Sequence, residues 1–301
     1  MDDRRQAATA SARPRIRSER ARRRALLVIL ALGNLAAPGA WGTDATDWPP
    51  TAGAGTDRAA IERFLLGAQI VELEELRVGI TRSRRAVLDD GSRRHRAHVQ
   101  TIDVVDDRHL GRPRGYRFRD SYRYNVAASI VDEMLGLGMV PVSVERRVGG
   151  RRAAVTWWVD DVMMMERDRI EGGIEPPRPG EWADQMGQAK VFSAWIANDD
   201  FNATNMLITE DWKLWLIDFT RAFRLEETTA LDPQRLPMLD RRVYRALRDL
   251  DETTMRMRLG DVLYKPEIAA LLKRRNALVE LYAARVEELG EAGAICDRPG
   301  H

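Results

Sequence analysis

Residues 195–223 read "WIANDDFNATNMLITEDWKLWLIDFTRAF" and combine three polar side chains with two short apolar runs. Asp200 and Asn205 stand five residues apart, just before the first run, and Asp218 directly follows the second run, "LWLI". Two such runs joined by a turn predict a pair of strands, which returns Asp218 to the side of Asp200 and Asn205. The stretch therefore predicts one cleft that holds all three side chains.

These residue types suit phosphoryl transfer. That reaction needs a carboxylate at the acceptor hydroxyl and further oxygen ligands that hold Mg²⁺ against the nucleotide phosphates. We expect Asp200 to orient the hydroxyl or accept its proton, and Asn205 and Asp218 to bind the metal. The alternative is structural: Asn198 and Asp199 turn the loop, and Asp218 is a turn residue.

The remaining sequence changes from strand patterns to helix patterns. The expected strands are 70–76, 84–90, 96–105, 140–148 and 151–162, with hairpin turns at Asp90-Gly91 and Gly149-Gly150, and the short pair 205–209 and 213–218. The expected helices are 59–70, 120–138, 181–198, 240–251, 251–263 and 265–290. For the helix at 120–138 we expect Asp120 or Ser121 as the N-terminal cap and Gly136 or Gly138 as the stop. The pattern predicts a β-rich lobe with one main helix, followed by a helical lobe.

Two segments resemble a known clan. "NDDFNATNMLI" at 198–208, followed by "LWLIDFTRAF" at 214–223, is similar to the catalytic and metal-binding segments of the atypical kinases. That clan includes HipA-like kinases, phosphatidylinositol 3/4-kinases and secretory-pathway casein kinases. "YNVAASIVDEMLGLGMVPVSVERR" at 124–147 resembles their N-lobe helix and the strand after it.

The resemblance runs from about Ile70 to Phe223 and implies a two-lobed, α+β protein kinase-like fold. We expect an N-lobe at 58–162 and a C-lobe with a helical tail at 163–301. The implied function is an ATP-dependent phosphotransferase that requires Mg²⁺ or Mn²⁺ and acts on a protein or small-molecule hydroxyl. The alternative is a pseudokinase, a module for nucleotide binding or interaction with weak or no catalysis.

The sequence departs from the clan where charge matters. Kinases of this type usually pair a strand lysine with a helix carboxylate to hold the nucleotide phosphates. The matching positions here are Gln100 and Asn125, a neutral pair. Arg84, Arg85 or Arg96 could supply the positive charge instead, or these arginines could be solvated strand residues. Phe201 also stands where relatives commonly have Arg.

Two further segments are candidates for nucleotide contact. The turn "LRVGITRSRRAVL" at 76–88 could meet phosphates, or it could be a plain hairpin loop. In "TWWVDD" at 156–161, Trp158 and Val159 resemble the adenine-facing connector between lobes, and burial in the core is the rival reading for the two tryptophans. "DVMMM" at 161–165 fits core filler better than an adaptable binding wall. The predicted nucleotide-binding residues are Gly79, Thr81, Ser83, Arg84, Gln100, Asn125, Trp158 and Val159.

The N-terminal residues differ from the rest in charge. Residues 1–42 hold nine arginines against three acidic residues, a local charge of +6, which leaves −4 for the remainder of a chain whose net charge is +2. The basic run and the apolar run that follows it predict a signal peptide at 1–42, and the Pro-, Gly- and Thr-rich residues 43–57 predict a linker. We expect export to a periplasm or the exterior, with no stable membrane span after cleavage. Without cleavage, the protein would be cytoplasmic or membrane-anchored.

Several other classes lack support in the sequence. A nucleic-acid binder should carry a basic patch on its folded part, which the acidic remainder does not suggest. Cys296 is the only cysteine, and the four histidines are scattered, so neither an intramolecular disulfide nor a zinc site is indicated. The expected partners are therefore a nucleotide and an unidentified hydroxyl acceptor.

Overall fold

The computed structural model of the 301-residue chain describes residues 58–76, 83–106 and 118–297. The signal peptide and linker predicted at 1–57 lie outside the described residues, as do Gly79 and Thr81 of the predicted phosphate turn. Within the described part, no helix is both long and apolar enough to cross a membrane.

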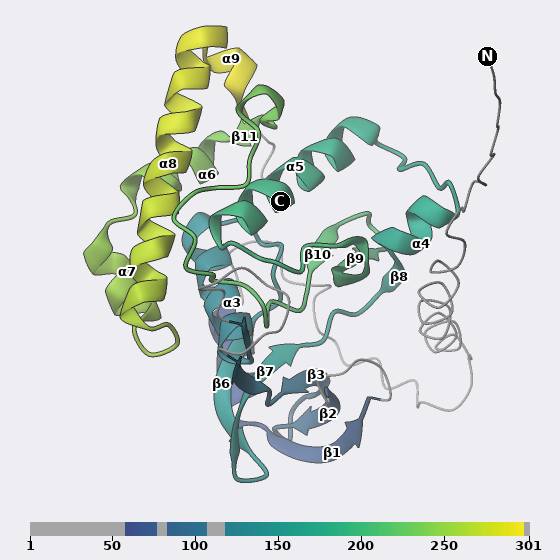
Figure 1. Ribbon diagram of the computed structural model, residues 1–301. Coiled ribbons are helices and arrows are strands. Elements are labelled where there is room, and N and C mark those ends of the chain that lie inside the picture. The colour runs from purple at the N-terminus through teal and green to yellow at the C-terminus, as the bar shows by residue number, and fades with distance from the viewer. Residues whose placement is uncertain (1–57, 77–82, 107–117, 298–301) are drawn as a thin grey trace, which may run out of the picture. The chain divides into compact units, whose positions relative to one another are not determined.

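The first half is built on a five-stranded antiparallel sheet in the order β1-β2-β3-β7-β6 (Figure 1). Its strands are β1 (Gln69–Glu75), β2 (Arg84–Asp89), β3 (Arg94–Gln100), β6 (Ser143–Val148) and β7 (Arg151–Trp157). The predicted hairpin turns are confirmed, since Gly91, Gly149 and Gly150 have φ values of 86°, 56° and 78°, which glycine adopts most readily.

One face of this sheet is covered by α2 (Arg58–Gly67). Phe64 and Leu65 of the helix pack in one hydrophobic cluster with Leu88, Val99 and Val155 from three strands. Because strand side chains alternate between the two faces, Gln100 projects from the opposite face to Val99. The strand predicted at 96–105 is in fact two strands, since β3 ends at Gln100 and β4 (Asp103–Asp106) pairs instead with β5 (Phe118–Ser121).

The main helix of this half is α3 (Arg123–Leu135). Gly136 ends it with a φ of 64°, as the sequence predicts. Neither expected cap, Asp120 or Ser121, holds the N-cap position, which is that of Tyr122, but Ser121 Oγ accepts from the N–H of Arg123 at 3.4 Å. At the other end, Asp132 accepts backbone N–H bonds from Gly138, Met139 and Val140 at 2.9–3.1 Å, which joins α3 to the turn before β6. Burial raises the pKa of Asp132 to about 6.

The second half is mainly helical and contains a three-stranded antiparallel sheet in the order β10-β9-β8. Its strands are β8 (Val162–Met165), β9 (Met206–Thr209) and β10 (Leu214–Leu216), and a parallel pair is formed by β11 (Leu239–Asp240) and β12 (Ile295–Cys296). The helices are α4 (Glu166–Glu171), α5 (Pro179–Trp195), η1 (Ala203–Asn205), η2 (Pro233–Arg235), α6 (Arg241–Asp249), α7 (Glu252–Leu259), α8 (Lys265–Leu289) and α9 (Glu291–Ala294). The antiparallel sheet followed by a helical part confirms the predicted α+β fold class.

The strand β8 is absent from the sequence prediction, which treated "DVMMM" as core filler. The segment is a strand because it pairs with β9, although its first two residues, Val162 and Met163, are both 40% exposed and only Met164 packs against the core. Because β8 begins at Val162 and pairs with β9, it runs across the expected lobe boundary at 162/163, which stays a prediction.

Helix α8 supports the segment that carries the predicted site. The side chain of Arg274 is fully buried and donates to the carbonyl oxygens of Trp195 and Arg224, at 2.6 and 2.8 Å. In return, the indole N–H of Trp195 donates to the carbonyl of Leu271 at 3.1 Å. Both ends of the segment 195–224 are thus fixed to one helix.

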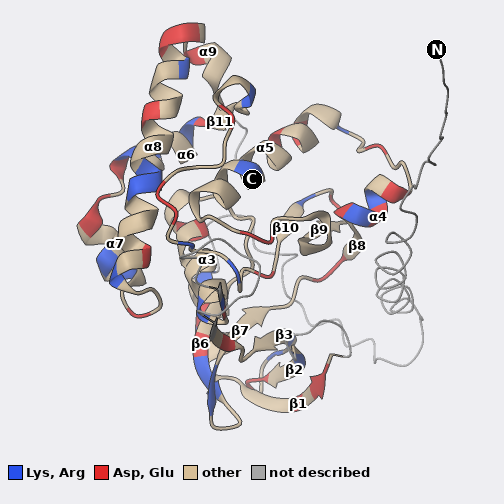
Figure 2. Cartoon of the chain, viewed as in Figure 1, with Lys and Arg blue, Asp and Glu red and all other residues tan. Residues whose placement is uncertain are grey.

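Figure 2 shows both acidic and basic residues on α4 and α7, where Glu166 pairs with Arg169 and Glu252 pairs with Arg256.

Candidate active site

Asp200 lies in a tightly bonded loop between α5 and η1. Its backbone N–H donates to Asn198 Oδ1 at 3.1 Å, and its carbonyl oxygen accepts from the side-chain amides of Asn202 and Asn205, both at 3.0 Å. Asn202 also donates to Asp200 Oδ1 at 2.9 Å. The asparagines therefore shape the loop and orient the carboxylate, which stays partly exposed.

Asp218 follows β10 and is brought beside this loop by backbone bonds. Ile217 N–H donates to the carbonyl of Asn205 at 3.0 Å, and Phe223 N–H donates to that of Ile196 at 2.6 Å. Asp218 has a φ of 58°, in the left-handed region that few non-glycine residues adopt. The hydroxyl of Thr220 donates to Asp218 Oδ1 at 3.0 Å. The predicted juxtaposition of the loop and the Asp218 turn is thus what the structure shows.

The electrostatics of this region are dominated by carboxylates. Burial raises the pKa of Asp218 above its usual value; hydrogen bonds from Thr220 oppose the shift, and the negative charges of Asp200 and Asp120 add to it. Arg221 contacts both neighbours, with Nη1 at 3.8 Å from Asp200 Oδ2 and Nε at 3.5 Å from Asp120 Oδ2. Three carboxylates and one guanidinium therefore share this corner.

The side chains at this corner fit a divalent cation whose remaining coordination positions are filled by ligands from outside the protein. Among the described residues, no three His, Cys, Asp or Glu side chains are placed to hold a metal by themselves. Mg²⁺ usually takes only one or two protein carboxylates and fills its remaining positions with water and substrate phosphate oxygens. Asp218 offers a carboxylate, Asn205 offers an amide oxygen, and Asp120 Oδ1 is buried with no hydrogen-bond partner among the described residues. Such a set suits Mg²⁺ or Mn²⁺ with a nucleotide.

Gln100 and Asn125 are both buried, 1% and 6% exposed, but no hydrogen bond joins them in the described part of the chain. Gln100 Nε2 donates to Ser83 Oγ at 3.1 Å, and its Oε1 accepts from the N–H groups of Thr101 and Ile102 at 3.0 and 3.4 Å. Asn125 Oδ1 accepts from Phe219 N–H at 2.8 Å. Gln100 therefore closes β3, and Asn125 ties α3 to the Asp218 turn.

The arginines predicted to replace the missing lysine lie in different surroundings. Arg85 pairs with Glu74 at 2.7 Å, Arg96 pairs with Asp160 at 2.7 Å, and Arg84 is half-buried at the start of β2. The cation that the structure places beside Asp200 is Arg221, which sequence reasoning missed. Its signal was its place three residues after Asp218 in the quoted stretch.

The connector between the two sheets separates its tryptophans. Trp157 is buried against the His95 ring, with centroids 3.5 Å apart, whereas Trp158 is half-buried. The carbonyl of Trp158 accepts from His95 Nε2 at 3.2 Å. Burial lowers the pKa of His95 to about 4, against the opposing charge of Asp160. Val159 is buried, and the adenine contacts predicted for Trp158 and Val159 stay predictions.

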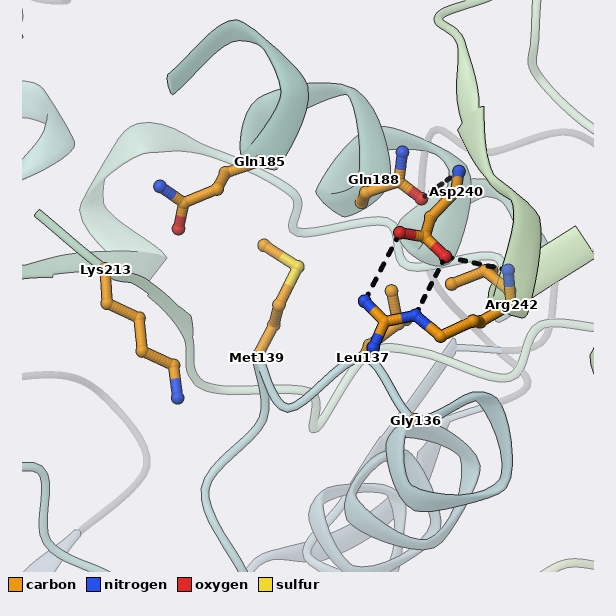
Figure 3. Close-up of a pocket in the computed structure, with 9 residues that line it drawn as sticks. Gly136, Leu137, Met139, Gln185, Gln188, Lys213, Asp240 and Arg242 are labelled. Carbon is orange, nitrogen blue, oxygen red and sulfur yellow. Dashed lines mark hydrogen bonds and ion pairs between the residues drawn. The ribbon is translucent and has the colours of Figure 1, made fainter. Parts of the chain in front are cut away.

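A separate small pocket of ≈ 40 Å³ lies among α3, α5, β10 and α6, and no predicted site residue lines it (Figure 3). Figure 3 shows Asp240 bonded to the side chains of Arg242 and Gln188. Burial lowers the pKa of Lys213, another residue of this pocket. The acidic corner with Asp200 and Asp218 is therefore the candidate active site.

No protein-family model matches the chain, and no curated protein sequence matches it significantly. Solved structures do match. Fam20 from hydra, solved with sugar, gives a TM-score of 0.59 at 12% identity, covering 84% of this chain and 97% of the other. The Golgi casein kinase with Mn/ADP bound gives 0.56 at 10% identity, covering 80% of each chain. The chain therefore has a kinase-like fold, while its likeness to HipA-like and phosphatidylinositol 3/4-kinases stays a prediction.

Proposed function

We propose that this protein is a nucleotide-dependent phosphotransferase that requires a divalent metal and acts on a hydroxyl group. The observation that carries the proposal is the position of Asp200, Asn205 and Asp218, which backbone bonds hold at one corner of a kinase-like fold. A structural reading of these residues explains the loop bonds of Asn198 and Asn202. It does not explain why the half-buried Asp218 lies close to two further carboxylates, those of Asp200 and Asp120.

In this proposal each residue has a separate task. Asp200, held by Asn202 and partly exposed, orients the acceptor hydroxyl and takes its proton. Asp218 and Asn205 hold the metal, which when bound neutralises charge on the nucleotide phosphates. Thr220 fixes the carboxylate of Asp218 in its orientation.

Arg221 supplies the positive charge that Gln100 lacks. The contacts of Arg221 with Asp120 and Asp200, at 3.5 and 3.8 Å, are longer than the 2.7–2.9 Å of a normal charge-assisted hydrogen bond. The guanidinium is 36% exposed, so it is accessible to an anionic group that enters the site. A phosphate oxygen is a suitable ligand because guanidinium and phosphate match in charge and geometry.

A pseudokinase is the second candidate, and a specific observation favours it. Gln100 and Asn125 are neutral, and both side chains are engaged in bonds that maintain the fold. A protein in which Arg221 does not compensate would bind nucleotide and turn it over slowly or not at all.

The structural neighbours share the kinase-like fold, and their bound molecules and names agree with the cofactors and the compartment that we propose. One was solved with Mn/ADP, which agrees with a nucleotide and a divalent metal. One was solved with sugar and one is a casein kinase, so a small-molecule and a protein hydroxyl both remain candidates for the acceptor. The Golgi name of one neighbour agrees with export of this chain after cleavage near Gly42.

The test is nucleotide binding and turnover by the full-length protein with ATP and either Mg²⁺ or Mn²⁺. Metal-dependent binding with phosphate release or transfer supports the enzyme, and binding without turnover supports the pseudokinase. Absence of any metal-dependent nucleotide binding would overturn both readings and leave only the fold.

A further inference from the structure

Asp120, at the end of β5, is a buried carboxylate that the fold does not satisfy. The residue is 3% exposed, and its Oδ1 has no hydrogen-bond partner among the described residues. The other oxygen, Oδ2, lies 3.5 Å from Arg221 Nε. An unpaired buried carboxylate oxygen is strongly unfavourable, and native proteins seldom retain one without a ligand or another role.

The backbone fixes Asp120 beside the Asp218 turn. The next residue, Ser121, donates its N–H to the carbonyl of Thr220 at 2.8 Å. One helical turn further on, Asn125 accepts from Phe219 N–H at 2.8 Å. These two bonds join the start of α3 to the residues that directly follow Asp218. The charge of Asp120 acts on Asp218, and one guanidinium reaches both Asp120 and Asp200.

The ordinary structural roles of a buried aspartate do not account for Asp120. It does not cap α3, because Tyr122 holds the N-cap position and the side chain that accepts from the first helical N–H, that of Arg123, is Ser121 at 3.4 Å. Asp132 shows what a structural aspartate looks like in this protein: it is 2% exposed and accepts three backbone N–H bonds. Asp120 has the same burial and none of those bonds.

We infer that Asp120 is a metal ligand, which provides a second carboxylate oxygen beside Asp218 and Asn205 for the divalent cation of the proposed function. The inference rests on that function. Two carboxylates match the charge of a divalent cation and the usual number of protein carboxylates around Mg²⁺. The assignment also gives the buried Oδ1 a partner. Asn125, one turn along α3, is neutral and already bonded to Phe219, so Asp120 is the residue of this junction that can bring negative charge.

The test measures binding of Mn²⁺ in the presence of ADP to the full-length protein, from the loss of the free-Mn²⁺ electron paramagnetic resonance signal. The variants are Asp120→Ala and the isosteric Asp120→Asn, with Asp103→Asn as the matched control on the partner strand, where Asp103 is exposed. Because loss of a group that only orients a ligand costs about 10- to 100-fold in metal affinity, Asp120→Ala should cost at least about tenfold. Asp120→Asn should fall between it and the wild type, and Asp103→Asn should match the wild type.

Thermal unfolding provides a second readout that a purely structural role would not reproduce. If Asp120 is a metal ligand, Asp120→Ala should melt at or above the wild-type temperature without metal, since a buried carboxylate oxygen that has no hydrogen-bond partner among the described residues is removed. The variant should also gain less from Mn²⁺ and ADP. A lower metal-free melting temperature with an unchanged Mn²⁺ effect would overturn the inference. Equal Mn²⁺ affinity in the wild type and both Asp120 variants would overturn the assignment of Asp120 and leave the proposed function standing. A wild type that takes up no Mn²⁺ with ADP would overturn the proposed function as well.

Discussion

Replacing Asn125 by alanine tests the link between α3 and the candidate metal site. The change removes the acceptor of the 2.8 Å bond from Phe219 N–H, a bond that is buried and joins residues 94 positions apart. A buried N–H left without a partner costs about 1–3 kcal/mol. A loss of about 2 kcal/mol corresponds to a fall of roughly 4–8 °C in the melting temperature of a domain of this size.

Differential scanning calorimetry of the full-length protein measures this change. The matched control is Asn202→Ala, the same substitution in the Asp200 loop, where the side chain caps η1 and loss of a cap costs about 1 kcal/mol. We expect Asn125→Ala to lower the melting temperature more than Asn202→Ala does. An Asn125→Ala protein that melts with the wild type would show that the bond does not hold the Asp218 turn, and the reasoning about this junction would be wrong.

The remaining predictions concern charge, metal and pH. Arg221→Ala should weaken nucleotide binding or turnover by roughly ten- to a hundredfold, as expected for one charge-assisted contact, while Arg85→Ala, which loses the pair with Glu74, should change it little. Gln100→Lys should add little if Arg221 supplies the charge, and a tenfold gain would instead favour the pseudokinase. Asn205→Ala should weaken Mn²⁺ binding measured with ADP, with an unchanged circular dichroism spectrum; a collapsed spectrum would point to a structural role. The folded-state pKa of His95, about 4, lies below its ordinary 6.5, so this residue should make the free energy of unfolding fall by up to about 3 kcal/mol between pH 6.5 and pH 4. Denaturant unfolding of His95→Gln across that range should show a flatter pH profile, and a slope equal to the wild type would contradict the assignment.

Much of the fold could be predicted because its signals are local. The helix that ends at Gly136 and the hairpins at Gly91 and Gly149-Gly150 follow from glycine and from periodicity over a few residues. The closeness of Asp200 and Asp218 also followed from a local feature, the strand pair between them. Strand β8 was missed because a run of three methionines has no alternation of polar and apolar residues, although one of them is exposed.

The roles of the neutral residues could not be predicted, because they depend on contacts between distant segments. The resemblance paired Gln100 with Asn125, but Gln100 bonds to the end of its own strand and to Ser83, and Asn125 bonds to Phe219. Asp120 or Ser121 was expected to cap the helix, since both residue types are common at that position, and the burial of Asp120 and its unpaired oxygen indicate another role.

Calorimetric titration of the full-length protein with ATP in the presence of Mg²⁺, beside the Asp218→Ala variant, shows whether nucleotide binding depends on a metal held by Asp218. We expect that the wild type binds the nucleotide, that chelation of the metal abolishes or strongly weakens binding, and that Asp218→Ala loses the metal-dependent part while its melting curve stays cooperative. Equal binding by the wild type and a folded Asp218→Ala variant, or binding that ignores the metal, would contradict this expectation.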